Sequence, residues 1–255
     1  MIFYFSATGN SKYVAMRIAQ ATREKAVSMT DCLHDNSLSF NIGENESIGF
    51  VTPTYFWGLP TVVVEFLDRV KLNMTGTHYA YHVLTFGTTT GQAHRMLEKK
   101  AARHGFKIDG KFNVRMVDSW TPLFDLSDSA KNMKITEAAE PAIAKAIEQI
   151  TAKTVGDFDN GKIPEPFSAL FYNTYRTGRK TKKFSVTDAC TGCGACERGC
   201  HAKAIEMKDG KPAWVKAQCT LCLSCLHHCP SFAIRYGAAS AKHGQFVNPN
   251  QLLYD

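Results

Sequence analysis

Residues 190–200 read Cys-Thr-Gly-Cys-Gly-Ala-Cys-Glu-Arg-Gly-Cys, and residues 219–229 read Cys-Thr-Leu-Cys-Leu-Ser-Cys-Leu-His-His-Cys. Both stretches have the spacing C-x2-C-x2-C-x3-C, and the second is the first displaced by 29 residues. The register continues beyond the cysteines, since Ala204-Ile205 corresponds to Ala233-Ile234. A repeat at one fixed displacement predicts two copies of the same structural unit, and therefore a pseudo-two-fold module.

The cysteine spacing favours iron–sulfur clusters over zinc. In two-cluster proteins with this run, three cysteines hold one [4Fe–4S] cluster and the fourth ligates the other copy's cluster. Zinc sites use four ligands arranged as C-x2-C pairs, which these runs fit poorly. Gly192 and Gly194 allow a tight turn in the first copy, whereas Leu221 and Leu223 in the second predict a drier cluster. The predicted ligands are Cys190, Cys193, Cys196 and Cys229 for the first cluster, and Cys219, Cys222, Cys225 and Cys200 for the second.

Two residues near this pattern have open roles. Cys229 is followed by Pro230, as the pattern expects, but Cys200 is followed by His201. His201 either donates a hydrogen bond to a ligand sulfur or is simply tolerated there. Cys32 lies outside both runs, and we expect it to be packed without a special role.

The first 155 residues alternate strand-like and helix-like segments. Such alternation predicts an α/β domain with a parallel sheet covered by helices on both faces. We expect a doubly wound, flavodoxin-like sheet of five strands in the order 2-1-3-4-5. The expected strands are 2–5, 26–29, 47–52, 79–86 and 112–117, and the expected helices are 10–21, 61–70, 91–104 and 137–150.

The remainder divides into three parts. Residues 156–186 read as a linker, because glycines and prolines interrupt any periodicity and basic residues cluster. Its aromatic residues predict that it packs on the rest of the chain. Residues 187–236 form the predicted small α+β two-cluster domain, and residues 237–255 form a polar tail. The basic cluster consists of Arg176, Arg179, Lys180, Lys182 and Lys183.

The loop after the first predicted strand suits a phosphate group. It reads Ser-Ala-Thr-Gly-Asn-Ser over residues 6–11, so hydroxyls, a glycine and a helix N-terminus converge there. Helix N-termini bind anions through free N–H groups and the helix dipole. The alternative is an ordinary N-cap turn. The predicted phosphate-binding residues are Ser6, Thr8, Gly9, Asn10 and Ser11.

This string resembles the loop that binds the FMN phosphate in flavodoxins, and two further loops extend the resemblance. In flavodoxin-like proteins the loop after the third strand supplies aromatic cover for the isoalloxazine, here Tyr55 and Trp57. Gly58 is expected to reach positive φ, so that its peptide can flip toward the flavin. The loop after the fourth strand would face the polar edge of the ring. The further candidates implied are Pro53, Thr54, Phe56, Thr85, Phe86, Gly87, Gly91 and Trp120.

Taken together, the three loops and eight cysteines resemble the EFR1-type flavodoxin–ferredoxin fusions over nearly all of residues 1–236. The resemblance implies FMN, two [4Fe–4S] clusters and electron transfer of the kind found in anaerobes. It implies no defined substrate.

Charge and composition restrict the remaining function classes. The formal charge is +7, but two clusters and an FMN phosphate, at roughly −2 each, bring it to about +1. A nucleic-acid partner is therefore not expected. Nine cysteines without a secretory signal favour metal ligation in a reducing cytoplasm, and no stretch approaches a membrane span.

Two functions remain open. The first is an electron relay between the clusters and FMN, serving a redox protein partner such as a ferredoxin or an oxidoreductase. The alternative is an FMN-dependent reductase of a small organic acceptor, fed by its own clusters. Residues 53–60 and 84–92 contain no Asp or Glu, and His82 and His94 flank the second of these loops. A flavin without carboxylates around it is reduced more readily by two electrons, which keeps the reductase alternative open.

Overall fold

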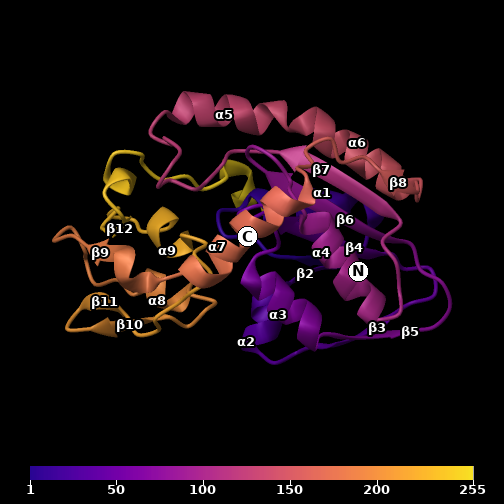
Figure 1. Cartoon of the computed structure of the whole chain (residues 1–255), viewed down its shortest axis with the longest axis horizontal. Helices are drawn as coiled ribbons and strands as arrows, with labels where there is room; N and C mark the ends of the chain where they lie inside the picture. Colours follow the sequence, from indigo (N-terminus) through magenta and orange to yellow (C-terminus); the bar gives the residue numbers. More distant parts are fainter. Residues whose placement is uncertain (255) are drawn as a thin grey trace.

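In a computed structural model of the protein, which describes residues 1–254, a parallel sheet forms the centre of the N-terminal part (Figure 1). Its strand order is β2-β1-β4-β6-β7-β8. The five predicted strands lie in the predicted order, but the count was one too low because β8 pairs with β7 at the edge. The strands are β1 (Ile2–Tyr4), β2 (Ala26–Ser28), β4 (Ile48–Pro53), β6 (Ala80–Phe86), β7 (Gly110–Arg115) and β8 (Gly156–Asp157).

Helices cover both faces of this sheet. One face packs Ile2, Val83 and Val114 against α1 (Asn10–Thr22) and α6 (Glu140–Thr151). The other packs Phe3 and Phe50 against α3 (Thr61–Arg69) and α4 (Ala93–Arg103). The helix expected over 137–150 is α6, preceded by a separate helix, α5 (Ser129–Ala138). The arrangement is the expected doubly wound α/β fold.

A small second sheet was not anticipated. Strands β3 (Ser39–Ile42) and β5 (Lys71–Met74) pair in parallel, and β3 follows the short helix α2 (Met29–His34) along the chain. Their exposed positions carry Ser, Asn and Lys, so neither segment shows the apolar run by which the central strands were found.

The C-terminal part is built around the cysteine repeat. Helix α8 (Ala195–Arg198) and helix α9 (Ser224–His227) each begin within one cysteine run. Strands β10 (Ile205–Lys208) and β11 (Lys211–Trp214) form an antiparallel hairpin, and β9 (Phe184–Val186) pairs with β12 (Ile234–Tyr236). The repeat extends to the backbone, because Gly192 and Gly194 have positive φ and so do Leu221 and Leu223.

The segment expected to be a linker contains regular structure. Besides β8 and the 3-10 turn η1 (Thr181–Lys183), it forms helix α7 (Glu165–Gly178), which lies between the two parts in Figure 1. The prediction that its aromatics pack is confirmed for Tyr172 and Tyr175, which are both buried. Tyr175 Oη accepts from the Thr61 N–H at 3.2 Å and donates to the Thr220 carbonyl at 2.9 Å, so α7 ties one part to the other.

The tail is also ordered in part. It contains η2 (Ala239–Ala241) and η3 (Pro249–Tyr254), and it returns to pack beside α1. Within residues 1–254, no helix has the length and apolar character that crossing a membrane requires.

Candidate functional site

The loop between β1 and α1 lies at the carboxyl end of the central sheet. Gly9 is the N-cap of α1 with φ 92°, so the loop turns directly into the helix. Ser11 Oγ and Thr85 Oγ1 lie 2.7 Å apart, and Thr8 Oγ1 donates to Ser119 Oγ at 3.4 Å. Hydroxyls and free helix N–H groups therefore gather at one end of a cavity, as anion binding requires.

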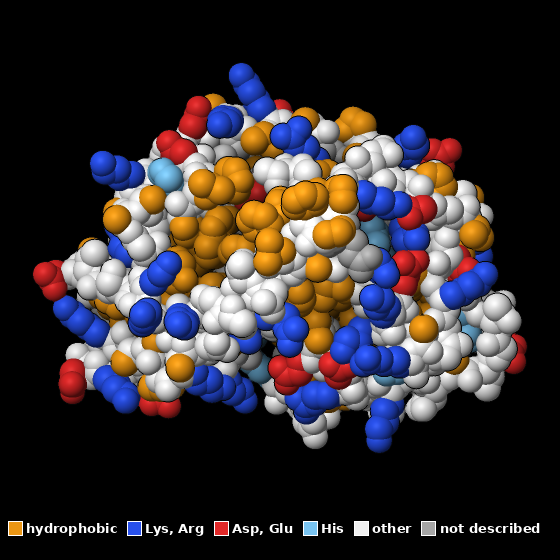
Figure 2. All heavy atoms as spheres, viewed as in Figure 1, with side chains coloured by type: hydrophobic (Ala, Val, Ile, Leu, Met, Phe, Trp, Pro, Cys, Tyr) orange, Lys and Arg blue, Asp and Glu red, His pale blue; other side chains and the backbone are white. Residues whose placement is uncertain are grey.

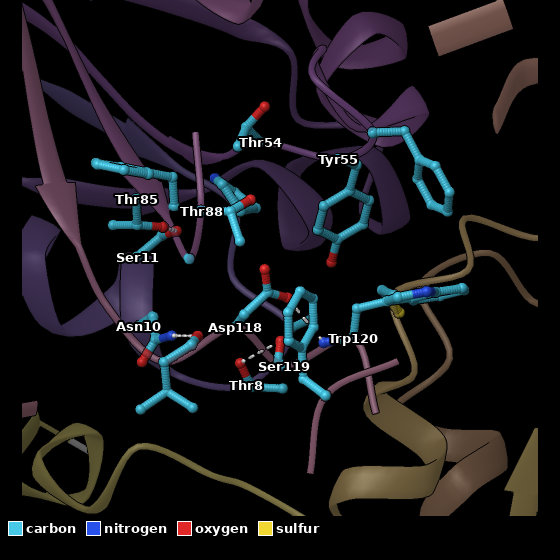
Figure 3. Close-up of a pocket in the computed structure, with 18 of the residues that line it drawn as sticks. Thr8, Asn10, Ser11, Thr54, Tyr55, Thr85, Thr88, Asp118, Ser119 and Trp120 are labelled. Carbon is cyan, nitrogen blue, oxygen red and sulfur yellow. Dashed lines mark hydrogen bonds between the residues drawn. The ribbon is translucent and has the colours of Figure 1, made fainter. Parts of the chain in front are cut away.

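The cavity, called the main pocket below, has a volume of about 300 Å³. Figure 3 shows its walls, with the Tyr55 hydroxyl and the Asp118 carboxyl both pointing toward its centre. Thirteen of the sixteen predicted flavin-site residues line it, whereas Gly9, Gly58 and Gly91 do not. Ala7, Thr88 and Thr89 also line it and belong to the predicted loops. The lining residues outside those loops and outside the predicted set are Val117, Asp118, Ser119, Leu123, Phe124, Phe171, Leu221 and Cys222.

Gly58 does not have the role expected from the sequence. Positive φ occurs instead at Phe56 (49°) and Trp57 (65°), while Tyr55 and Gly58 form an antiparallel bridge across this turn. A Cβ on Gly58 would lie 2.3 Å from the Tyr172 ring, so the glycine allows a close approach to α7. The expected flipping peptide at Gly58 is therefore not supported by the backbone.

Aromatic side chains surround the other end of the main pocket. Phe56 lies edge-on to Trp120, with ring centroids 5.2 Å apart, and Trp57 lies edge-on to Phe171 of α7 at 4.4 Å. Phe171 and Leu123 remain exposed at the mouth. Figure 2 shows hydrophobic side chains gathered on this face, over α7 and the chain that follows β7.

Asp118 places a carboxyl group in a pocket whose predicted loops, 53–60 and 84–92, contain none. It follows β7 and lies on the wall of the main pocket, where its Oδ1 accepts the Trp120 N–H at 3.1 Å. Burial raises the pKa of this carboxyl above its usual range, and the hydrogen bond partly opposes that shift. The loops 53–60 and 84–92 lack carboxylates, as noted, but the loop after β7 supplies one to the main pocket.

The two histidines beside the third predicted loop do not reach the main pocket. His82 lies in the core, where its Nε2 is 2.9 Å from Thr52 Oγ1 and its Nδ1 is 3.0 Å from His94 Nδ1. Burial lowers the pKa of His82 well below its usual value and that of His94 to about 4. Asp159 continues this buried network, with Oδ2 3.8 Å from His94 Nε2.

The eight repeat cysteines surround two separate cavities. The first cysteine cavity is lined by Cys190, Cys193, Cys196 and Cys229, and the second by Cys200, Cys219, Cys222 and Cys225. Each set takes three cysteines from one run and the fourth from the other, which is the crossed arrangement expected. Within the described part of the chain, no three or more His, Cys, Asp or Glu side chains converge closely enough to hold a single metal ion.

Backbone N–H groups already point at cysteine sulfurs. Ala204 N–H donates to Cys200 Sγ and Ala233 N–H to Cys229 Sγ, both at 3.3 Å and both at equivalent positions of the repeat. Such hydrogen bonds stabilise a cluster thiolate and tune its potential. His201 also lines the second cysteine cavity, and its buried Nε2 has no hydrogen-bond partner within residues 1–254. A cluster or ligand sulfur is a suitable acceptor for that nitrogen, so the donor set fits iron–sulfur clusters.

Exposure distinguishes the two cysteine sets. Cys193 of the first set is exposed, while Leu221 and Leu223 bury the loops of the second. Burial raises the pKa of the Cys222 thiol to about 12 and that of Cys225 well above its usual value. Cys222 lines both the second cysteine cavity and the main pocket, so it lies at the boundary between them.

The main pocket fits a flavin mononucleotide in its chemistry. Its hydroxyl-rich end can hold a phosphate by N–H and O–H groups alone, because no Lys, Arg or His occurs among its described lining residues. Its other end offers aromatic faces for a planar ring. Ser6, Thr8 and Ser11 would hold the phosphate, and Tyr55, Trp57 and Trp120 would contact the ring.

Comparison with known families agrees with this division. A flavodoxin domain matches residues 1–116, and a 4Fe-4S dicluster domain matches residues 189–234. The chain is therefore a fusion of a flavodoxin domain and a ferredoxin-type iron–sulfur domain. It has a flavin and iron–sulfur redox role.

Three solved structures are similar to this chain at low sequence identity. The Trp repressor binding protein from Bacillus subtilis is 14% identical, with a TM-score of 0.38, over 58% of this chain and 94% of that one. A rubredoxin oxygen:oxidoreductase from Desulfovibrio gigas is 18% identical, with a TM-score of 0.34, over 60% and 36%. A flavone reductase is 12% identical, with a TM-score of 0.36, over 91% and 85%. No curated protein matches the chain.

Proposed function

We propose that this protein relays electrons between an external redox protein, two [4Fe–4S] clusters and FMN. The observation that carries the proposal is the position of Cys222, which lines both the second cysteine cavity and the main pocket. A cluster held by Cys222 would lie against the flavin with no intervening domain. The exposure of Cys193 supports the approach of a protein partner to the first cluster.

These positions support an order of transfer. With a cluster held by each cysteine set, the first cluster would exchange electrons with the partner and the second with FMN. Each cluster carries one electron at a time and FMN holds two, so the relay joins one-electron and two-electron chemistry. The free cysteines and their expected cluster chemistry favour a reducing cytoplasm for this activity.

Cluster-deficient variants test the relay. A reduced ferredoxin is mixed with the holoprotein, and flavin and cluster absorbance are followed separately. We expect Cys225→Ser and Cys193→Ser each to slow FMN reduction at least about tenfold when FMN is supplied in excess to keep its site filled. Cys32→Ser, a buried cysteine of the flavodoxin domain, is the matched control and should react at the wild-type rate. Unchanged FMN reduction in Cys225→Ser would rule out this route.

A reductase function is the second candidate, and one observation favours it. The main pocket opens at a surface formed by exposed Leu123 and Phe171, through which an uncharged organic acceptor can approach the flavin. Reoxidation of the reduced holoprotein by small uncharged aromatic acceptors, measured anaerobically, tests it. Reoxidation by protein partners alone would leave the relay as the sole function.

A further inference from the structure

The C-terminal tail contains a four-residue stretch, 245–248, that contacts both cofactor sites. It follows η2 and leads back to the loop before α1 (Figure 1). We call it the bridging segment.

On one side, the bridging segment holds helix α9 of the cluster domain. Gln245 Nε2 donates to the carbonyls of Leu226, at 2.6 Å, and Cys229, at 2.9 Å. The Phe246 N–H donates to His227 Nδ1 at 3.1 Å. The bonds therefore fix the turn between Cys225, a predicted ligand of the second cluster, and Cys229, a predicted ligand of the first.

On the other side, the bridging segment holds the phosphate loop. The Asn248 N–H donates to the Thr8 carbonyl at 2.7 Å, and Asn248 Nδ2 donates to Asn10 Oδ1 at 2.9 Å. Asn10 Nδ2 in turn donates to the Val117 carbonyl at 3.1 Å. Asn248 is fully buried, so these bonds form away from solvent and are costly to break.

His227 adds a direct bond between the two domains. Because its Nδ1 accepts the Phe246 N–H, the neutral ring carries its proton on Nε2, which donates to the Ser119 carbonyl at 2.9 Å. Ser119 lines the main pocket. The same segment therefore orients the ring that connects α9 to the pocket wall.

We propose that the bridging segment couples the two cofactor sites, so that filled cluster sites raise the affinity for FMN and bound FMN slows the loss of iron. A segment of four residues that is bonded at both ends transmits a shift of α9 to Thr8 and Asn10. Coupling of this kind is reciprocal, since each ligand changes the other's affinity by the same factor. The inference rests on the proposed cofactors and not on the direction of electron flow.

The decisive experiment measures ligand retention at one cofactor site after a substitution made beside the other site. Gln245→Met removes the amide donors beside Cys229 and keeps the side-chain length. It should raise the dissociation constant for FMN, measured by flavin fluorescence, by about fivefold. Asn248→Ala should speed iron release to a ferrous chelator by a similar factor. Lys242→Ala, in the same tail with an exposed side chain, should change neither quantity.

The wild-type protein supplies a direct measure of the coupling. Adding FMN to flavin-depleted protein should slow iron release severalfold, and Gln245→Met should abolish that effect. Asn248→Asp, which keeps the side-chain size, replaces Asn248→Ala if that variant does not fold. If each variant affects only its own neighbouring site, the coupling proposal is wrong while the cofactors stand. If the protein binds no FMN or no iron, the proposed function itself fails.

Discussion

Asp118 is a carboxyl group on the wall of the main pocket whose pKa burial raises. Below that pKa the group is neutral, and above it the group adds a negative charge close to a phosphate and to a flavin that becomes negative on reduction. FMN binding should therefore weaken relative to Asp118→Asn as the pH rises from 5 to 8. We expect a ratio of wild-type to variant dissociation constants of about ten at pH 8, equivalent to ~1.4 kcal/mol, and a smaller ratio at pH 5.

The ratio cancels the ionisation of the FMN phosphate itself, which is common to both proteins. The Asp118→Asn variant keeps a side-chain oxygen for the Trp120 N–H, so the loop is retained. A ratio that does not change between pH 5 and pH 8 would mean that Asp118 does not sense the bound flavin.

Gly58 also leads to a prediction at this scale, because its role in the structure is packing. A Cβ at this position would meet the Tyr172 ring at 2.3 Å and Met96 Sδ at 2.9 Å. Gly58→Ala should therefore displace α7 and lower the free energy of unfolding by about 1–3 kcal/mol, as overpacking does. Gly178→Ala, in the same helix and with no atom within 4 Å of the added carbon, should not destabilise. Urea denaturation compares the two, and equal stability would contradict this explanation.

At the scale of elements, the basic cluster lies on α7, on η1 and on the two residues between them, but its members differ. Arg179 donates to the Cys219 carbonyl at 2.7 Å and lies over the Tyr175 ring, so it stabilises the cluster domain. Arg176, Lys180, Lys182 and Lys183 are exposed. These four remain candidates for steering an acidic redox partner, and the alternative is a solvated segment that offsets cluster charge.

Steering predicts a dependence on ionic strength. The rate of reduction by an acidic ferredoxin should fall as salt rises, because screening shortens the range of attraction. Lys182→Gln with Lys183→Gln should lower the rate severalfold at low salt and have little effect at high salt. Lys145→Gln, an exposed lysine of α6, is the control. Rates that respond to neither salt nor these substitutions would exclude steering by this segment.

At the scale of the whole molecule, the crossed cysteine sets predict which variants share a phenotype. Anaerobically purified protein should contain one FMN and about eight irons and eight sulfides per chain. Cys229→Ala should lose the same cluster as Cys193→Ala, and Cys200→Ala the same cluster as Cys222→Ala. Iron analysis with electron paramagnetic resonance distinguishes the clusters. If Cys200→Ala matched Cys193→Ala, each run would hold its own cluster.

The local patterns of the chain predicted much of the site. Ser6–Ser11 and Pro53–Trp57 follow strands whose carboxyl ends meet at one edge of a parallel sheet, so their convergence on one pocket followed from topology. The cysteine sets were predicted from the spacing of the two-cluster ferredoxin run, and the same sets line the two cysteine cavities. Asp118 and Ser119 were missed, although they follow the fifth predicted strand, because neither belongs to a recognisable motif.

The sequence by itself determined the two domain types, because each depends on periodicity or spacing within a short stretch. The order of the main strands and the crossed cysteine sets were predicted from the likeness to flavodoxins and to two-cluster ferredoxins. Only the tertiary structure decided how the domains join. The contacts of Tyr175, Asn248 and Cys222 with the flavodoxin domain connect residues more than 100 positions apart. Such contacts leave no local periodicity, since they depend on where a helix or a tail lies in the folded chain.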